Sequence, residues 1–585
     1  MLKYIFTLCA ALASMVGGAH NLLFNESGKF KIVQITDVHF KNGNAASDVA
    51  LELFDEIIEN EKPDLVVFTG DIVVEPAPVI EGWKKVIAPF QKAQIPMAIV
   101  LGNHDDEHNS TREEINSFLM NEPYCLVEDE DYVLEIEGKE SEKAALLYMF
   151  DSNSYSTLEN VSGYGWFSLD QIQNYVTKSK SYTEMNNGEK IPSLAFFHIP
   201  LPEYSSAYNN KTFPAIGFRG EEECPPKINT GMFAAMVEMG DVMGCFVGHD
   251  HVNDYIAYQN DIALAYGRFS GGKTTYGDLT NGCRVIILEE GQRKFTSYIR
   301  ERGGNVLFHS EYPRKLRFAV TADTHFDMPP ETDQYKNVMA LNKLQLDGVS
   351  IVGDVFDRQH PSVIELFKLR YEKNRGVSDS TLNANLYIGL GNHDINPVSS
   401  DEKQNLLERN LTLAYTDSLL LAMKSEGLIK NMHAETRNYS FELNGVHFVQ
   451  THTFAGDTTL GEGGLQWLKE DLKKNAAKGK SVVLLMHYTF TKSERWITNT
   501  ERYNLAEALK GYNIKAIFNG HDHVAKNEKW NGIEVFTADN VWKDDENVNP
   551  SFYLIEYDKI DGMEVKQCFW DNDTNDLTIK LIKKL

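Results

Sequence analysis

The sequence predicts an α/β (α+β) protein built from two tandem domains of similar design, and three observations support this. At 585 residues the chain is too long for one hydrophobic core. Apolar runs of strand length alternate with helical patterns, and polar motifs follow the strands, as in parallel sheets. The same ordered motifs recur about 280 residues later, a period far above the roughly 20–50 residues of solenoid repeats. We therefore expect duplication of a whole domain.

The composition indicates a globular, acidic protein. Hydrophobic residues make up 42% of the chain and aromatic residues 11%, which is typical of a protein with a large core. The formal net charge is −27. Binding along a nucleic-acid backbone requires a basic face, so we expect no such partner. A phosphorylated small molecule or a phosphoprotein remains a candidate substrate, because metal ions can supply local positive charge. The composition gives no oligomeric state.

The N-terminus predicts a signal peptide over residues 1–19. Lys3 precedes an apolar run from Tyr4 to Val16, and Gly17-Gly18-Ala19 offers small residues for cleavage. The run is too short to span a bilayer, and no later stretch reaches about 18 apolar residues. The segment 577–585 shows no lipid-anchor signal. We expect a protein without a membrane anchor that is secreted or lumenal, or periplasmic if the source is bacterial.

Cysteines and glycosylation sequons fit this compartment. Five cysteines follow the signal, with no CxxC spacing, so a zinc–thiolate site is not expected: Cys125, Cys224, Cys245, Cys283 and Cys568. One or two disulfides are possible among the first four, but the pairing cannot be assigned. Asn-x-Ser/Thr sequons begin at Asn25, Asn109, Asn160, Asn210, Asn410, Asn438 and Asn572. They predict a glycoprotein, unless the source is bacterial.

The first predicted domain covers residues 28–305. Its opening apolar run, 31–36, predicts a buried strand that ends at Asp37-Val38-His39. Helical spacing over 49–58 follows, and the next strand, 65–69, ends at Gly70-Asp71. A second helix, around 83–91, leads to a strand that ends at Gly102-Asn103-His104-Asp105. Further apolar strands end at His198 and at Gly248-His249-Asp250-His251.

The second predicted domain covers residues 314–585 and repeats this order after a predicted linker at 312–315. Strands at 316–322, 349–352, 386–390, 482–486 and 516–519 are followed in turn by the same five motifs: Asp323-Thr324-His325, Gly353-Asp354, Gly391-Asn392-His393-Asp394, His487 and Gly520-His521-Asp522-His523. Taken singly, each motif could be turn chemistry or a buried histidine. The ordered set, present twice, favours a functional site in each half.

These side chains predict two metal ions in each domain. Asp, His and Asn ligands without cysteine suit Zn²⁺, Mn²⁺, Fe or Mg²⁺. In the first half we assign Asp37, His39 and His251 to one ion, Asn103, His198 and His249 to the other, and Asp71 as the bridge. In the second half the corresponding sets are Asp323, His325 and His523; Asn392, His487 and His521; and the bridge Asp354. A bridging carboxylate suits ions about 3.5–4 Å apart, which would acidify a shared water to a hydroxide that attacks phosphorus in line.

The remaining motif residues are candidates for catalysis. His104 and His393 stand next to predicted ligands, where each could protonate the leaving oxygen or stabilise the transition state. Asp105 and Asp394 could orient these histidines through a hydrogen bond. In the second half, four histidines belong to no shared motif, and we expect them to be structural or surface residues: His360, His433, His447 and His452.

The ordered motifs resemble those of the calcineurin-like metallophosphoesterase superfamily: Asp-x-His, Gly-Asp, Gly-Asn-His-Asp, His and Gly-His-x-His. The first half resembles more closely the small purple-acid-phosphatase-like proteins, through the segments 30–39, 198–204, 229–231 and 248–254. The resemblance implies a β-sandwich flanked by helices in each domain, a dinuclear metal site and hydrolysis of phosphoric esters.

One position departs from the pattern of true purple acid phosphatases. Those enzymes place a metal-binding tyrosine three residues after the bridging Asp, whereas this chain has Val74 and Asp357 there. An iron–tyrosinate centre is therefore not supported in either half. Asp357 could be a further polar group near the second site or could pair with Arg358.

The reaction class is clearer than the substrate. We expect a secreted, acid-phosphatase-like phosphomonoesterase with two catalytic domains. A phosphodiesterase or nucleotidase would use the same metal chemistry, because the loops decide which phosphoryl groups gain access. A further alternative is that one domain, more readily the second, is a non-catalytic binding module.

Overall fold

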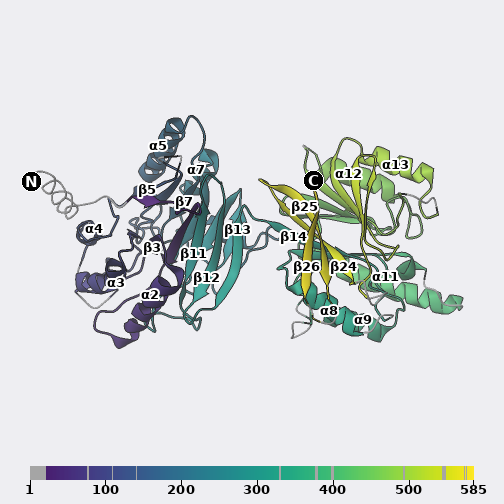
Figure 1. The fold of residues 1–585 in the computed structure, drawn as a ribbon, viewed down its shortest axis with the longest axis horizontal. Coiled ribbons are helices and arrows are strands. Elements are labelled where there is room, and N and C mark those ends of the chain that lie inside the picture. The colour runs from purple at the N-terminus through teal and green to yellow at the C-terminus, as the bar shows by residue number, and fades with distance from the viewer. Residues whose placement is uncertain are drawn as a thin grey trace, which may run out of the picture. The chain divides into compact units, whose positions relative to one another are not determined.

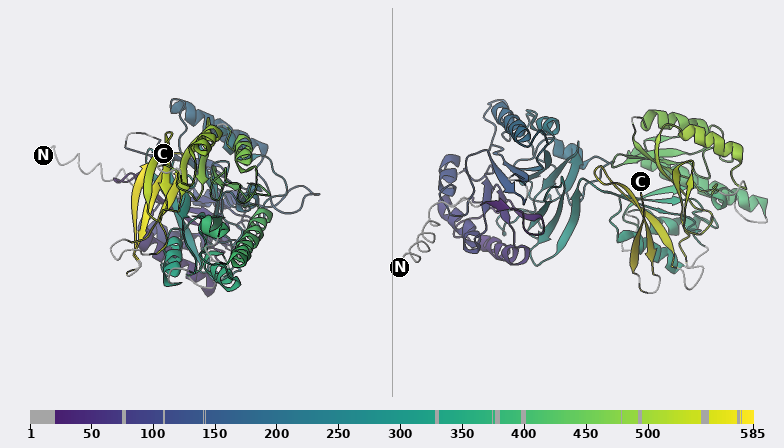
Figure 2. Two further views of the ribbon diagram at one scale, coloured as in Figure 1. Left: turned by 90° about the vertical axis from the view of Figure 1, so that its right-hand side faces the viewer. Right: turned by 45° about the horizontal axis from the view of Figure 1, so that its top comes forward.

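The computed structural model describes residues 21–74, 78–107, 110–139, 141, 143–327, 331–373, 375, 380–396, 401–477, 479–491, 495–542, 549–571, 574 and 576–585. The predicted signal peptide and the sequons at Asn109 and Asn572 lie outside these residues. The chain divides into two compact units, and the boundary in the sequence falls between Pro313 and Arg314. Figure 1 and Figure 2 show the helices and strands of each unit.

Two sheets form the centre of the first unit. One has the strand order β1 (Leu22–Leu23), β5 (Tyr132–Glu137), β6 (Ala145–Met149), β7 (Ser193–Phe196), β8 (Val242–Val247), β10 (Ile262–Tyr266) and β9 (Ile256–Gln259). The other has the order β13 (Val306–Tyr312), β12 (Phe295–Glu301), β11 (Gly282–Glu289), β2 (Lys29–Ile35), β3 (Leu65–Thr69) and β4 (Met97–Val100).

Helices cover the outer faces of these two sheets. They are η1 (Ala45–Ser47), α2 (Asp48–Glu61), α3 (Val79–Ala93), α4 (Arg112–Leu119), α5 (Leu169–Met185), α6 (Glu203–Tyr208) and α7 (Met232–Met239). In Figure 1, α2 and α3 lie on one side of the unit, and α5 and α7 on the other. Successive strand residues point to opposite faces. Leu147 therefore joins the core between the sheets, while Tyr148 joins the core beneath α5 and α7.

The second unit has the same construction. One sheet has the order β16 (Asn385–Gly389), β15 (Gly348–Val352), β14 (Leu316–Thr321), β24 (Ser551–Asp558), β25 (Gly562–Trp570) and β26 (Leu577–Lys584). The other has the order β17 (Asn431–Met432), β18 (Tyr439–Leu443), β19 (Val446–Gln450), β20 (Ser481–Leu485), β21 (Asn513–Asn519), β23 (Ile533–Thr537) and β22 (Lys526–Trp530).

Its helices are α8 (Glu331–Asn342), α9 (Pro361–Tyr371), α10 (Asn392–Ile395), α11 (Glu402–Ser425), α12 (Gly464–Asn475) and α13 (Asn499–Leu509). Separate apolar clusters fill the space between the sheets, the space beneath α9, and the space beneath α12 and α13. The predicted fold class, two tandem sandwiches flanked by helices, is confirmed.

The first unit extends beyond the predicted range of 28–305. At one end β1 pairs with β5, with Leu22 opposite Ile136. At the other end β13 pairs with β12, with Tyr312 opposite Phe295. Both are edge strands of the sheets, and backbone pairing places them in the unit although neither belongs to a motif. All five cysteines in the described part of the chain are free, so the disulfides considered from the sequence do not form in this structure.

The sheet topology gathers the motifs at one edge of each unit. Strands β2, β3 and β4 are parallel neighbours, and so are β6, β7, β8 and β10. The second unit repeats this with β14, β15 and β16, and with β19, β20, β21 and β23. Parallel strands end at the same edge of a sheet, which is where open α/β sheets bind ligands.

Candidate metal centres

The backbone at the strand ends adopts a left-handed conformation at many predicted ligands. Positive φ angles occur at Asp37, His39, Asp71, His249, Asp323, His325, Asp354, His521 and His523. Such angles are uncommon outside glycine and cost about 1–3 kcal/mol each. They turn the chain sharply off the strand and direct these side chains to one place.

The first centre consists of two groups of donors that share one carboxylate. Asp37, His39, Asp71 and His251 form one group, and Asp71, His198 and His249 form the other; within each group the donor atoms lie within 4.8 Å of one another. Asp71 Oδ2 is 3.7 Å from His39 Nε2 and 3.1 Å from His198 Nε2. The shared carboxylate occupies the place that a bridging ligand requires.

The donor atoms of the first centre fit a pair of metal ions. Asp71 Oδ2, Asn103 Oδ1, His198 Nε2 and His249 Nε2 are buried and form no hydrogen bond with the described residues. Unsatisfied buried polar atoms are costly, and cations placed among them would satisfy all four. Carboxylate, imidazole and amide donors suit Zn²⁺, Mn²⁺, Fe or Mg²⁺.

The surroundings of His39, His249 and Asp71 favour the protonation states that metal binding needs, whereas burial of His198 is outweighed by the nearby Asp71 carboxylate, which raises the pKa of His198 to about 9. His198 Nδ1 lies 2.8 Å from the carbonyl oxygen of Thr69, so a proton on Nδ1 leaves Nε2 free for a metal ion. Burial lowers the pKa of His39 to about 4 and that of His249 to about 3. Burial alone would raise the pKa of Asp71, but the charges of His198 and His39 bring it well below its usual range.

The second centre has nearly the same geometry. Asp323, His325 and His523 form one group, and Asp354, His487 and His521 form another. Asp354 Oδ2 is 3.7 Å from His325 Nε2 and 3.2 Å from His487 Nε2, and Asn392 Oδ1 is 3.2 Å from His487 Nε2. The second centre is more open: the side chain of His523 is 33% exposed, whereas that of His251 is 6% exposed.

Gly102 and Gly391 allow the loops to close on the bridging carboxylates. A Cβ atom at Gly102 would overlap the carboxylate and backbone of Asp71, and one at Gly391 would overlap Asp354. Neither glycine has a positive φ angle. Their requirement is therefore steric and does not come from backbone conformation.

Asp105 and Asp394 do not orient the neighbouring histidines, which corrects the sequence-based prediction. Asp105 is buried, and its two oxygens accept hydrogen bonds from the backbone N–H groups of residues 71, 72, 73 and 102, at 2.8–3.0 Å. Asp394 accepts equivalent bonds from residues 355, 356 and 391. In each unit, this carboxylate ties the Gly-Asn-His-Asp motif to the loop that carries the bridging Asp.

Other carboxylates contact the two candidate catalytic histidines. His104 Nδ1 lies 2.6 Å from Glu107 Oε2, and the hydroxyl of Tyr155 donates to the other oxygen of Glu107. His393 Nδ1 lies 3.5 Å from Asp357 Oδ1, and this contact raises the pKa of His393. Glu107 was not among the predicted site residues, although its position three residues after His104 is a signal in the sequence.

The position of the purple-phosphatase tyrosine differs between the two units. Val74 is a buried apolar side chain. Asp357 lies between His393 and His325, 3.6 Å from His325 Nδ1, and forms a third cluster of possible metal donors with them. Of the two alternatives left open for Asp357, the structure therefore supports a polar group beside the second centre.

The four histidines of the second half that belong to no motif lie outside both centres. His360 caps the N-terminus of α9, and His433 contacts Thr436. His447 forms a buried pair with Asp471, at 2.7 Å. His452 Nδ1 accepts a hydrogen bond from the backbone of Leu390, and burial lowers its pKa to about 4. These contacts give all four a structural explanation.

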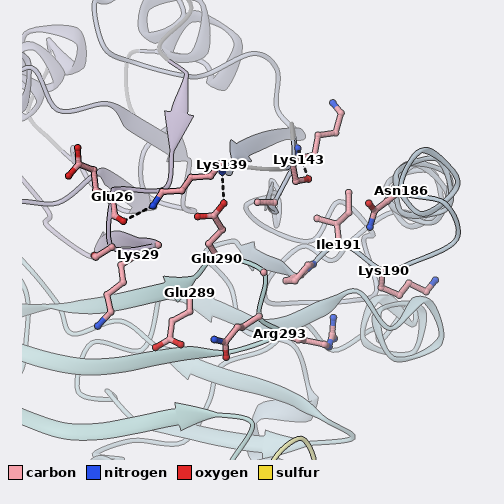
Figure 3. A pocket seen from close by; sticks show the side chains of 17 residues that line it. Glu26, Lys29, Lys139, Lys143, Asn186, Lys190, Ile191, Glu289, Glu290 and Arg293 are labelled. Atoms are coloured by element: carbon pink, nitrogen blue, oxygen red, sulfur yellow. Dashed lines mark hydrogen bonds between the residues drawn. The ribbon is translucent and has the colours of Figure 1, made fainter.

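A separate cavity of about 860 Å³ in the first unit contains none of the predicted ligands. Lys29, at the beginning of β2, and Glu290, after β11, both line it. Figure 3 shows Lys139 contacting both Glu26 and Glu290 in this cavity. The candidate centre instead follows the ends of the parallel strands.

Comparison with known proteins gives matches in both halves. The family model for calcineurin-like phosphoesterases matches residues 30–253 and 316–525. A protein of Arabidopsis thaliana named probable inactive purple acid phosphatase 14 is 34% identical over 48% of this chain and 80% of its own. Phosphatase DCR2 of Saccharomyces cerevisiae is 33% identical over 43% of this chain and 49% of its own. The crystal structure of a dimetal phosphatase from Danio rerio covers 48% of this chain and 99% of that chain, at 15% identity and a TM-score of 0.34.

Proposed function

Because the chain belongs to the calcineurin-like phosphoesterase family through both of its halves, we propose that it is a metal-dependent phosphatase that hydrolyses phosphomonoesters at one centre in each unit. The observation that carries the proposal is the shared carboxylate. Asp71 Oδ2 and Asp354 Oδ2 each lie between two histidines of different donor groups, at 3.1–3.7 Å. When bound, a pair of metal ions supplies positive charge for the phosphoryl oxygens and acidifies the attacking water.

The protein residues position the substrate and handle the proton. His104 and His393 hold a proton on Nε2 for the leaving oxygen, while Nδ1 of each faces a carboxylate, Glu107 or Asp357. A carboxylate at Nδ1 fixes the orientation of the ring, as in other histidine–carboxylate pairs. Asp105 and Asp394 hold the bridging loops and do not meet the substrate.

Three matched proteins of Arabidopsis thaliana carry the word inactive in their names, so the proposal of activity rests on this chain's own residues. Each centre here keeps a full set of donors, including the bridging Asp and the Asn ligand. The second centre is the more open of the two, and it remains the better candidate for a non-catalytic module.

We also propose that the protein is secreted or lumenal and glycosylated, on the strength of the N-terminal signal pattern and the sequons. Within the described residues, no helix has both the length and the apolar character needed to cross a membrane.

A substrate panel on single-centre variants tests the proposed reaction. A phosphomonoester, a phosphodiester and a nucleotide would be compared on the wild type and on Asp71→Ala and Asp354→Ala. We expect turnover of the monoester by the wild type and by both single variants, each through its intact centre. Preferential hydrolysis of the diester would establish the phosphodiesterase alternative. Full activity in the double variant, Asp71→Ala with Asp354→Ala, would refute the two-metal chemistry.

A further inference from the structure

Three tyrosines stand beside the first centre and come from outside its motifs. Tyr155 and Tyr164 lie on the loop between β6 and α5, and Tyr276 lies on the loop between β10 and β11. We refer to these three residues as the tyrosine triad.

Each histidine of the Gly-His-Asp-His motif has a triad ring against it. The ring of Tyr164 meets His249 edge-on, with centroids 4.2 Å apart and an interplanar angle of 90°. The ring of Tyr276 lies nearly parallel to His251, at 4.3 Å and 30°. Tyr155 stacks on Tyr164 at 5.9 Å. The triad therefore flanks the donors of both predicted ions.

Two of these rings are exposed and yet held in place. Tyr155 is 43% exposed and Tyr276 is 52% exposed. The hydroxyl of Tyr155 donates to Glu107 at 2.6 Å, and that of Tyr276 lies 3.0 and 3.1 Å from the oxygens of Glu221. A ring fixed at both ends loses little conformational entropy when a ligand stacks on it.

This side of the centre is also the side that opens to water. The side chain of His104 is 37% exposed, whereas those of Asp71 and His198 are almost completely buried. A phosphate ester that reaches the buried donors from this side brings its leaving group to His104 and the triad.

We propose that the first centre prefers phosphate esters whose leaving group carries a planar, uncharged aromatic ring, which stacks on the outer face of Tyr276. This inference rests on the proposed phosphatase function and specifies its substrate class. One face of Tyr276 packs on His251, and its exposure leaves the other face for a ligand. The carboxylates of Glu107 and Glu221 disfavour a leaving group that bears further negative charge.

The second centre shows a comparable arrangement built from different residues. The ring centroids of Trp496 and His521 are 4.6 Å apart with an interplanar angle of 85°. Those of Trp542 and His523 are 5.3 Å apart with an interplanar angle of 82°. Trp496 follows β20, whereas Tyr164 of the first unit follows β6, so the loops that supply the two rings are not equivalent. Trp542 lies between β23 and β24, which correspond to β10 and β11 on either side of Tyr276. An aromatic ring therefore recurs beside the last histidine of the motif in both units, and this recurrence supports a role in binding.

The test compares esters that differ only in the ring. The Asp354→Ala background leaves only the first centre active. The esters 2-phenylethyl phosphate and 2-cyclohexylethyl phosphate have similar alkoxide leaving groups, so their intrinsic reactivities match. Aromatic pairing predicts a ratio of kcat/KM, phenyl over cyclohexyl, of about 3–10. Adenosine 5′-monophosphate and ribose 5-phosphate form a second pair, with an expected ratio of about five or more. The pair with the larger ratio identifies nucleotides or simple aryl-bearing esters as the source of the ring.

Variants show whether Tyr276 is the recognition surface. Tyr276→Leu should bring both ratios close to one, and Tyr276→Phe should preserve them. The matched control is Tyr182→Leu, because Tyr182 on α5 also donates to a carboxylate, that of Glu135, and contacts no predicted ligand among the described residues. A ratio cancels any equal effect on both esters, such as a weakened support for His251.

The outcomes separate this inference from the proposed function. Ratios near one in the Asp354→Ala background, or high ratios that survive Tyr276→Leu, would overturn it. If the Asp354→Ala variant hydrolyses no ester, the proposed phosphatase activity of the first centre is refuted. Calorimetric titration of the metal-loaded protein with 2-phenylethyl- and 2-cyclohexylethylphosphonate then decides the ring preference. Tighter binding of the phenyl compound, lost in Tyr276→Leu, supports the inference, and equal affinities overturn it.

Discussion

Replacing Asp105 by asparagine separates a residue that builds the first centre from one that takes part in its chemistry. The two oxygens of Asp105 each accept two backbone N–H bonds, from residues 71 and 102 and from residues 72 and 73. An amide keeps only one oxygen and turns its NH2 group toward the other two donors. Asp105→Asn therefore loses two bonds and sets donors against donors in a buried place.

The expected loss is large. A hydrogen bond to a charged group contributes about 1.5–3 kcal/mol, so the loss of two costs about 3–6 kcal/mol. Folded domains are stable by only about 5–15 kcal/mol. At about 2–4 °C per kcal/mol, the melting temperature of the first unit should fall by roughly 6–24 °C. The metal content of the first centre should fall with it, because the loop that carries Asp71 loosens.

Calorimetry and metal analysis on matched variants check this reasoning. Asp106→Asn makes the same charge change one residue away on a partly exposed side chain, and it should shift the melting temperature by no more than a few degrees. Asp394→Asn should reproduce the effect in the second unit. If Asp105→Asn kept its stability and its metal but lost turnover, the carboxylate would act in the chemistry and our assignment would be refuted.

Further outcomes follow from the same contacts. Glu107→Gln should lower kcat at the first centre about tenfold or more with the metal content unchanged; loss of metal instead would make Glu107 a part of the donor set. Asp357→Asn should do the same at the second centre, and an unchanged kcat would leave His393 without a carboxylate partner in catalysis. Chelation should abolish turnover and readdition of Zn²⁺, Mn²⁺ or Fe should restore it, whereas activity that persists in demetallated protein would exclude metal catalysis. In protein secreted from eukaryotic cells, mass spectrometry should find glycan at the exposed Asn25 but none at Asn438, which is 3% exposed; a glycan at Asn438 would contradict this packing.

The sequence predicted the parts of the fold that repeat and the strand ends that carry polar residues. Apolar runs such as 65–69 and 349–352 became buried parallel strands because their patterns are local and strong. The edge strands β1 and β13 were not expected, because their place depends on pairing with distant strands. A strand that forms only when its partner is in place leaves a weak local pattern.

Within the centres, the sequence suggested which residues gather but not what each one contacts. The same tetrapeptide supplies a donor at Asn103, an exposed histidine at 104 and a buried backbone clamp at Asp105, and spacing alone does not distinguish these roles. Glu107 and Asp357 reach the equivalent histidines from different loops. Tyr276 lies in an irregular loop, where periodicity carries no information.

Counting metal ions tests the central claim, one dinuclear centre in each unit, most directly. Metal analysis of the purified protein with both units should find about four ions per molecule. Asp71→Ala and Asp354→Ala should each lower this toward two, and the double variant should bind almost none. A wild-type chain with two ions or fewer after metal loading, or a double variant that keeps all of its metal, would contradict the account.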